Sequence, residues 1–249
     1  MRIEIVALSA LPEVRPGDDL ALLIRQAAAT EGQTMDRSVV LAVAQKVVSK
    51  AEGAVVDLRE IQPSVLARSW ADEWNKDARL IELILSQSRR IVKMDRAVII
   101  AETRHGLVCA NAGVDQSNVV QSNNEGADFA TVLPNDPDAS ARRLRVSLEC
   151  GAVIITDTFG RPWREGLVDV AIGVAGLDPL DDHRGRTDRQ GRKLASTIIA
   201  VADQLAAAAG LVMPKGSGCP VVLIRGYEFQ RAEGSTRSLL RKPEQDLFR

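Results

Sequence analysis

The segment from residue 151 to residue 176, GAVIITDTFGRPWREGLVDVAIGVAG, constrains the fold more than any other part of this chain. Its residues 152–155 form a short apolar run rich in β-branched side chains, which predicts a buried strand. A Thr-Asp-Thr sequence centred on Asp157 follows, then an expected turn at residues 159–160 and a second apolar run over residues 168–174. A carboxylate between hydroxyl groups at the end of a buried strand can hold a hard divalent cation. It can equally close the strand with a polar turn, and both readings stay open at this point.

Strands and helices are mixed along the rest of the chain without strict alternation, which favours an α+β fold over a doubly wound sheet. Asp18 and Asp19 are candidate caps for the first expected helix. Asp136 is the predicted cap of a later one, and Pro137 suits the first position of that helix. We expect strands over residues 2–8, 39–44, 97–101, 107–110 and 221–224, with a hairpin at 103–106. We expect helices over residues 18–30, 64–74, 78–88, 136–150 and 192–211, and a loop over 121–128.

Length and composition describe an ordinary globular protein, with 249 residues, 45% hydrophobic and 26% charged. A net charge of −1 and only 3% aromatic residues argue against a nucleic-acid surface. The chain has no apolar stretch of transmembrane length, and its N-terminus lacks the pattern of a signal peptide.

Three widely spaced cysteines form neither a zinc motif nor a disulfide framework, so we expect a reduced, cytoplasmic setting. Cys109 and Cys150 lie in or beside apolar runs, where thiols are usually inert. His105 is expected to be a solvated surface histidine.

Polar clusters follow several of the apolar runs, which suggests a shared site. The clusters are residues 11–14, 45–50, 115–118 and 157–158, and the Gly-containing loop 213–218 is a fifth. Asp115 and Asp157 are the candidate ligands for Mg²⁺, and Lys46 and Lys50 would meet phosphate charge. The chain has no GxxxxGK[ST] loop and no GxGxxG fingerprint, which excludes a P-loop or Rossmann nucleotide site.

A set of ordered motifs makes the chain resemble the coenzyme F(420)-0:L-glutamate ligase family, the gamma-glutamyl ligases of deazaflavin coenzyme biosynthesis. The motifs are GDDL (17–20), VSKAEG (48–53), NAGVDQSN (111–118), LPNDPD (133–138), IITDTFGR (154–161), AIGVAG (171–176) and DRQGR (188–192). The resemblance extends to Gly226 and implies an unusual two-lobed, mixed-sheet α+β fold, as a single ligase domain over residues 1–249. We expect no fused C-terminal nitroreductase-like domain of the kind that some relatives carry.

The resemblance implies a GTP-dependent ligase that adds L-glutamate to the deazaflavin precursor F(420)-0 through an acyl phosphate, with gamma linkages after the first addition. It implies Mg²⁺ or Mn²⁺, with K⁺ as a further candidate cation, and a homodimer. The apolar run 167–177, with Trp70 and Trp74, is a candidate dimer surface, although the monomer core is an equally good place for it. The alternatives are a related amide ligase acting on a different carboxylate or amino acid, and a catalytically silent nucleotide-binding dimer.

The resemblance also assigns roles to individual residues. It implies metal ligands at Asp115, Asp157 and Thr158, and GTP contacts at Leu11, Pro12, Glu13, Val14, Gln45, Lys46, Lys50, Asn118, Met213, Lys215, Gly216 and Gly218. Lys215 stands where we expect archaeal members to place an amide on a second metal. An ammonium group cannot ligate a metal, so Lys215 is expected at the phosphates instead. From charge alone, Arg161, Arg164, His183 and Arg186 are candidate contacts for the deazaflavin phosphate or glutamate.

Overall fold

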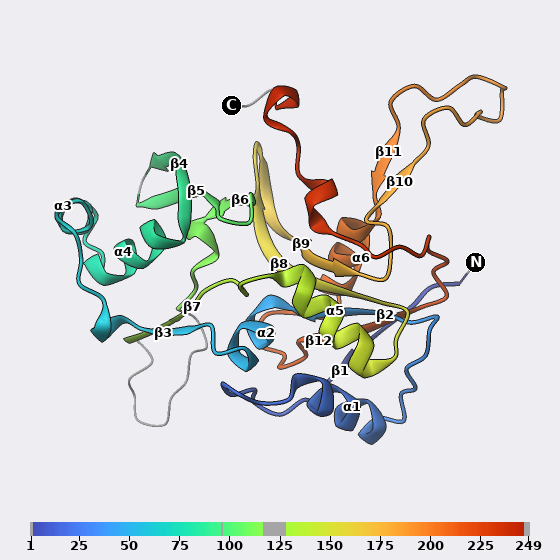
Figure 1. Cartoon of the computed structure of the whole chain (residues 1–249), viewed down its shortest axis with the longest axis horizontal. Coiled ribbons are helices and arrows are strands. Elements are labelled where there is room, and N and C mark those ends of the chain that lie inside the picture. The colour runs from blue at the N-terminus through green and yellow to red at the C-terminus, as the bar shows by residue number, and fades with distance from the viewer. Residues whose placement is uncertain (1, 96, 117–127, 247–249) are drawn as a thin grey trace.

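A computed structural model of the chain describes residues 2–95, 97–116 and 128–246, and Figure 1 shows how their helices and strands are arranged. Five strands form the central sheet in the order β1-β12-β2-β8-β9. β2 and β8 run parallel, whereas the other neighbouring pairs are antiparallel. The bounds are β1 Glu4–Leu8, β2 Val40–Ala44, β8 Ala152–Arg161, β9 Arg164–Ala175 and β12 Val221–Arg225. The sheet is therefore mixed, and the predicted α+β class is confirmed.

Helices cover both faces of this sheet. On one face lie α1 (Leu20–Thr30), α2 (Gln45–Ala51) and α5 (Pro137–Leu148), and on the other lies α6 (Val201–Gly210). Successive strand residues point to opposite faces, so Leu41 packs with the first group and Val40 with α6. Because both faces are buried there, β2 and the first four residues of β8 read as continuous apolar runs rather than alternating ones.

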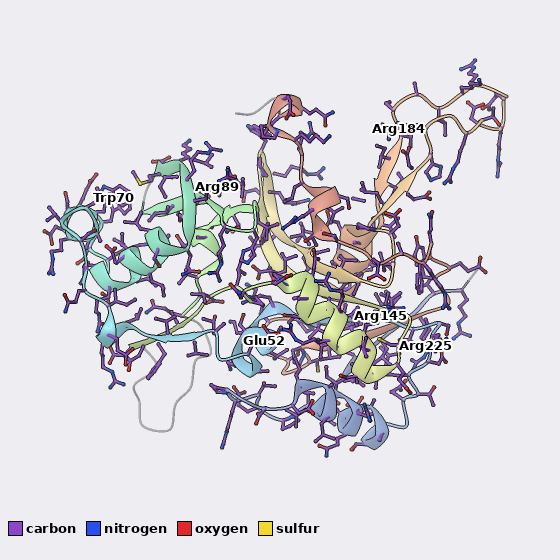
Figure 2. All side chains as sticks on the ribbon, in the orientation of Figure 1. Glu52, Trp70, Arg89, Arg145, Arg184 and Arg225 are labelled. Carbon is purple, nitrogen blue, oxygen red and sulfur yellow. The ribbon has the colours of Figure 1, made fainter. Side chains whose placement is uncertain are left out.

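The helix caps follow the sequence prediction. Asp19 accepts a hydrogen bond from the Leu22 amide at 3.0 Å, and Asp136 accepts one from the Ala139 amide at 2.9 Å. Pro137 occupies the first position of α5, where its missing N–H costs nothing. The Arg145 guanidinium, labelled in Figure 2, then donates to the Gly151 carbonyl at 2.9 Å and ties the end of α5 to the start of β8.

A smaller lobe, made of residues 54–95, 97–116 and 128–132, has a hydrophobic core of its own. It contains α3 (Val65–Trp74), α4 (Ala78–Gln87), an antiparallel sheet of β4 (Ser88–Asp95), β5 (Val98–Thr103) and β6 (Val108–Ala110), and the pair β3 (Val55–Asp57) and β7 (Phe129–Thr131). Short 3₁₀ helices lie at η1 (Leu58–Glu60) and η2 (Asn111–Gly113). The predicted helices over 64–74 and 78–88 and the hairpin at 103–106 are confirmed to within about two residues.

Two extensions leave the main body. β10 (Leu180–Asp182) pairs with β11 (Ile198–Ala200), and the segment between them projects away from the sheet in Figure 1. Figure 2 labels Arg184 on this arm, where its guanidinium forms a 2.6 Å ion pair with Asp182. After β12 the chain returns through η4 (Thr236–Leu239) and η5 (Pro243–Gln245), with Asp138 accepting hydrogen bonds from Ser235 and Thr236.

Two boundary predictions are wrong. The Ala-rich pattern predicted a helix over residues 192–211, but α6 begins only at Val201 because the β-branched residues before it pair with β10 as β11. A turn was expected at residues 159–160, but β8 continues to Arg161 and the reversal occurs at residues 162–163. The predicted loop over 121–128 lies, apart from its last residue, outside the described residues.

The apolar run 167–177 belongs mostly to the monomer core, which is the second of the two expectations for it. Ala171 to Leu177 contribute side chains that are at most 4% exposed, whereas Leu167 is 60% exposed. Gly173 provides close approach within the monomer, because a Cβ there would lie 2.5 Å from the Pro137 carbonyl oxygen. Trp70, labelled on α3 in Figure 2, stacks on Trp74 with ring centroids 5.6 Å apart, and both pack against the smaller lobe's core.

Candidate functional site

The sheet topology brings four of the predicted polar segments to one edge of the central sheet. Ala44, the last residue of β2, is paired with Thr156 in parallel β8, so the residues after Ala44 and the second half of β8, from Asp157, lie at the same edge. The antiparallel pairing of Leu8 with Val221 places the end of β1 and the start of β12 there too. Segments 11–14, 45–50, 157–158 and 213–220 therefore meet, as expected for ligand sites at the carboxyl ends of parallel strands.

These segments line a cavity of about 530 Å³. The lining residues come from the loops 11–14 and 213–220, from the end of β2 and from α2, from β8 and β9, and from Asp115 in the smaller lobe. They are Leu11, Pro12, Glu13, Val14, Ala44, Gln45, Lys46, Val47, Lys50, Asp115, Thr156, Asp157, Thr158, Asp169, Met213, Pro214, Lys215, Gly216, Ser217, Gly218, Cys219 and Pro220. The cavity thus collects the predicted metal ligands and, within the described residues, the predicted nucleotide contacts.

The first loop is shaped by two buried apolar anchors. Leu11 and Val14 are at most 9% exposed and pack into the main core, so the intervening Pro12 and Glu13 face the solvent side. On the opposite wall, the loop 213–220 runs from α6 into β12, and the Pro220 carbonyl accepts a hydrogen bond from the Ala44 amide at 2.8 Å. This bond fixes the loop beside the start of α2.

Asp157 carries the most unusual electrostatics in the cavity. The pKa of its carboxyl group is raised from 3.8 to about 6, mainly by burial and further by the charges of Asp115 and Asp169. The Thr158 amide, which donates to Asp157 at 2.9 Å, and the charge of Lys46 act in the opposite direction. A carboxylate that is costly to ionise gains most from a bound cation, and such groups cluster at functional sites.

Two lysines of α2 are held in the cavity by carboxylates. The Lys46 ammonium group lies 2.9 Å from an Asp115 carboxylate oxygen, and the Lys50 ammonium group lies 2.5 Å from Glu13. Lys50 is only 8% exposed, whereas the Glu13 side chain is 65% exposed and can move away from it. Gln45 is turned inward, donating to the Ser49 hydroxyl and the Val132 carbonyl.

The lining charges favour a divalent cation together with an anionic ligand. Four carboxylates (Glu13, Asp115, Asp157 and Asp169) and three ammonium groups (Lys46, Lys50 and Lys215) line the cavity. Asp115, Asp157 and Thr158 supply oxygen donors, which fit a hard cation such as Mg²⁺. Within the described ranges, no three His, Cys, Asp or Glu side chains form a metal-binding group. Mg²⁺ does not require such a cage, since it commonly uses one or two carboxylates with water and phosphate oxygens.

Some predicted site residues do not line this cavity. Arg161 donates to the carbonyls of Glu165 and Gly166 within its own hairpin, and Arg164 is exposed beside the same turn. His183 and Arg186 lie on the projecting arm, where both contact Asp181. Their contact with a substrate stays a prediction. Asn118 lies outside the described residues.

Asp169 is the main cavity residue that the sequence prediction missed. It faces Thr158 across the β8–β9 pair and accepts a 2.6 Å hydrogen bond from the Thr158 hydroxyl. A carboxylate within an otherwise apolar strand was a signal for it. Its partner, Thr158, could not be identified from the sequence, because the turn between β8 and β9 was expected at the wrong residues.

The histidine and cysteine predictions have different outcomes. The expectation of a solvated His105 is wrong, because its Nε2 lies 2.9 Å from the Pro134 carbonyl and burial lowers its pKa. Cys109 and Cys150 are buried, and burial raises the pKa of their thiols to about 12 and about 11, consistent with inert side chains. Across the described part of the chain, no helix is long and apolar enough to cross a membrane.

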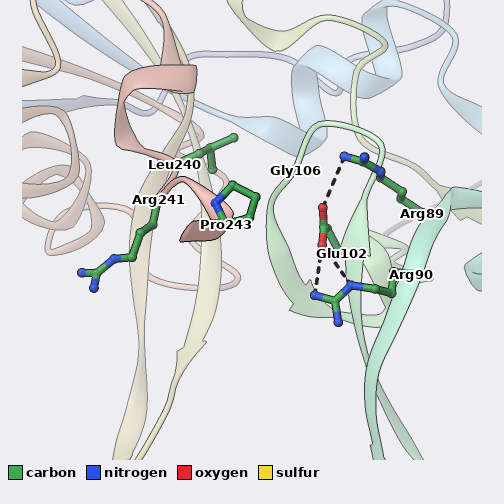
Figure 3. Close-up of a pocket in the computed structure, with 7 residues that line it drawn as sticks. All are labelled: Arg89, Arg90, Glu102, Gly106, Leu240, Arg241 and Pro243. Carbon is green, nitrogen blue, oxygen red and sulfur yellow. Dashed lines mark hydrogen bonds and ion pairs between the residues drawn. The ribbon is translucent and has the colours of Figure 1, made fainter. Parts of the chain in front are cut away.

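A second cavity, of about 430 Å³, lies between the smaller lobe and the C-terminal segment (Figure 3). A β-bulge between Ser88 and Arg90 lets two successive arginines reach Glu102, Arg89 at 3.6 Å and Arg90 at 3.2 Å. Its lining residues are Arg89, Arg90, Glu102, Gly106, Leu240, Arg241 and Pro243. None of them is a predicted site residue.

Comparisons with known proteins find relatives along almost the whole chain. Residues 9–226 match the family model described as F420-0:Gamma-glutamyl ligase. The chain is 46% identical to the coenzyme F420:L-glutamate ligase of Methanothermobacter thermautotrophicus, with 100% of both chains aligned. It is 48% identical to the protein of the same name from Methanopyrus kandleri, with 100% of this chain and 98% of that one aligned. The corresponding protein of Methanocaldococcus jannaschii is 39% identical, with 100% and 97% aligned.

Proposed function

The chain belongs to the F420-0:gamma-glutamyl ligase family, and from this premise we propose that it joins L-glutamate to the deazaflavin precursor F420-0 at the expense of GTP. The observation that carries the proposal is the meeting of Lys46, Lys50 and Lys215 with Asp115 and Asp157 around one cavity. Such a combination of ammonium groups and carboxylates suits a polyphosphate bound together with a divalent cation.

In this proposal the GTP phosphates lie toward Lys50 and Lys46, between the loops 11–14 and 213–220. Both lysines are already charge-paired, so an incoming phosphate would compete with Glu13 for Lys50 and with Asp115 for Lys46. The exposed Glu13 side chain can leave at little cost. Lys215 on the opposite loop would supply further positive charge.

Asp115, Asp157 and Thr158 would hold Mg²⁺ or Mn²⁺, which when bound neutralises charge on the transferring phosphoryl group. Asp157 is suited to this role because burial has already removed part of its hydration, so its ionised form is poorly stabilised in the free protein. Lys46, which contacts Asp115, would be released toward phosphate as that carboxylate turns to the cation. K⁺ as an additional cation is part of the proposal.

The proposed reaction has two steps. A carboxylate oxygen of F420-0 attacks the γ-phosphorus of GTP, the bond to the β-phosphate oxygen breaks, and GDP leaves. The glutamate amine then attacks the acyl carbon and inorganic phosphate leaves, while the amine loses a proton. Neither step needs a side-chain nucleophile, in keeping with the buried, high-pKa thiol of Cys109. The chain's own task is to position the reactants and exclude water.

Oxygen transfer tests the acyl-phosphate step. F420-0 carrying ¹⁸O in its reacting carboxylate should yield inorganic phosphate with one ¹⁸O for each amide bond formed. The same label remaining entirely in the amide product and water would contradict an acyl phosphate. Omission of glutamate controls for hydrolysis of the intermediate.

The proposal includes a homodimer. The exposed apolar side chains at the β8–β9 turn, Trp163 at 81% and Leu167 at 60%, offer a surface that a second copy could cover. The larger part of the run 167–177, from Ala171 onward, is buried in the monomer core and is therefore not part of this surface. Exposed apolar patches often mark protein–protein interfaces. The resemblance to the ligase family, which implies a homodimer, also supports this part of the proposal.

A further inference from the structure

Asp169 lines the cavity but has no role among the proposed metal ligands. Its carboxylate oxygen Oδ1 accepts a hydrogen bond from the Thr158 hydroxyl at 2.6 Å, and both residues line the cavity. The two residues are opposite each other in the β8–β9 register, so this contact is built into the strand pairing. Asp157, the neighbour of Thr158, is the half-buried carboxylate of the same strand.

The direction of this hydrogen bond limits what Thr158 can do. A threonine hydroxyl has one proton to donate and two lone pairs to accept with. Because the proton is committed to Asp169, the oxygen can meet other groups only through its lone pairs. It is therefore prepared to bind a cation and is unable to donate to a phosphate oxygen.

Gly210, at the end of α6, makes room for Asp169. A Cβ at this position would lie 2.4 Å from the second carboxylate oxygen of Asp169, closer than real Cβ atoms come. Gly210 has no positive φ, so backbone conformation does not require glycine there. The close approach to Asp169 does.

We propose that Asp169 is a positioning residue, which holds the Thr158 hydroxyl as a cation ligand, with Gly210 keeping the carboxylate in place. This inference rests on the proposed function, because it assumes the divalent cation at Asp115, Asp157 and Thr158. Residues that orient metal ligands typically change metal affinity by about 10–100-fold when removed.

Manganese binding tests the proposal without turnover. Titration with MnCl₂ in the presence of GTP, followed by the electron paramagnetic resonance signal of free Mn²⁺, gives the affinity of each variant. Thr158→Val and Asp169→Ala should each weaken Mn²⁺ binding by roughly 10–100-fold. The double variant should be no weaker than Thr158→Val alone, since the two residues act as one unit. Independent, multiplying effects would overturn the proposal.

Three further variants separate the hydrogen bond from charge and from folding. Asp169→Asn keeps an acceptor oxygen for Thr158 and should retain most of the affinity; a loss as large as that of Asp169→Ala would mean that charge alone matters, and would overturn the proposal. Gly210→Ala leaves both side chains intact, yet should weaken Mn²⁺ binding by displacing Asp169. Asp203→Ala is the control, because Asp203 also accepts a hydrogen bond from β9, at the Ala171 amide, but lies outside the cavity lining.

The outcomes also distinguish this inference from the proposed function. If the wild-type chain binds Mn²⁺ and Asp169→Ala binds it equally well, the role of Asp169 is wrong and the metal proposal stands. If the wild-type chain binds no Mn²⁺ with GTP present, the metal proposal fails and the inference fails with it.

Discussion

Replacing Asp157 by asparagine should stabilise the metal-free protein while it abolishes ligation. The folded chain holds the pKa of this carboxyl group near 6, against 3.8 in an ordinary environment, mainly because the group is buried. At about 1.4 kcal/mol for each pKa unit, ionised Asp157 costs the folded state up to about 3 kcal/mol. Asparagine is neutral at every pH and keeps an oxygen that can accept the Thr158 amide hydrogen bond.

The sign of this effect depends on pH. Below pH 3.8 the carboxyl group is protonated in both the folded and unfolded states, and the substitution should change little. Between pH 3.8 and pH 6 the unfolded chain ionises first, so wild-type stability falls as pH rises. Above pH 6 the full cost is present. We therefore expect the variant's advantage to be about 2 kcal/mol at pH 5 and about 3 kcal/mol at pH 8.

Urea unfolding with a chelator present, at pH 5, 6 and 8, measures this difference. Asp72→Asn is a matched control, because Asp72 is exposed on α3. The reasoning is refuted if Asp157→Asn is less stable than the wild type at pH 8, or if its advantage does not change with pH. Full ligase activity in this variant would refute the assignment of Asp157 to the metal.

Three other predictions concern the nucleotide, the assembly and the C-terminal segment. Lys50→Ala should weaken GTP binding by at least about 1.5–3 kcal/mol in calorimetry, with exposed Lys93→Ala as control, and unchanged affinity would mean that the phosphates lie elsewhere. Sedimentation at micromolar concentration should give a dimer, and a mass near 26.9 kDa would reject it. Asp138→Ala removes the acceptor for the Val174 and Thr236 amides, so limited proteolysis should cut this variant after β12 faster than the wild type; equal rates would show that the segment is held by other contacts.

The parts of the fold with strong local signals could be predicted from the sequence. β2 and the start of β8 are β-branched runs buried on both faces, and Asp19 and Asp136 are caps whose hydrogen bonds form as expected. The site followed from these elements, since polar residues after neighbouring strands meet at one sheet edge. The pairing of Ala44 with Thr156 brings Lys46 and Asp157 to the same cavity.

The missed features depend on long-range pairing. β3 and β7 are three residues each and are stabilised by one another across the intervening lobe, so neither has a local pattern of its own. β11 interrupts an Ala-rich helical pattern only because β10 is available to pair with it. Asp169 could be placed in the site only with the register of the β8–β9 hairpin. The turn expected at residues 159–160 gives a different register.

The product of a complete reaction tests the central claim most directly. Purified chain incubated with F420-0, GTP, Mg²⁺ and L-glutamate should convert the deazaflavin to species heavier by whole glutamyl residues, as seen by mass spectrometry, with GDP formed in proportion. ATP in place of GTP and omission of Mg²⁺ should each prevent this conversion. An unchanged F420-0 mass under the complete conditions, with folded protein and no GDP formed, would contradict the account and favour a silent nucleotide-binding protein or a ligase for another carboxylate.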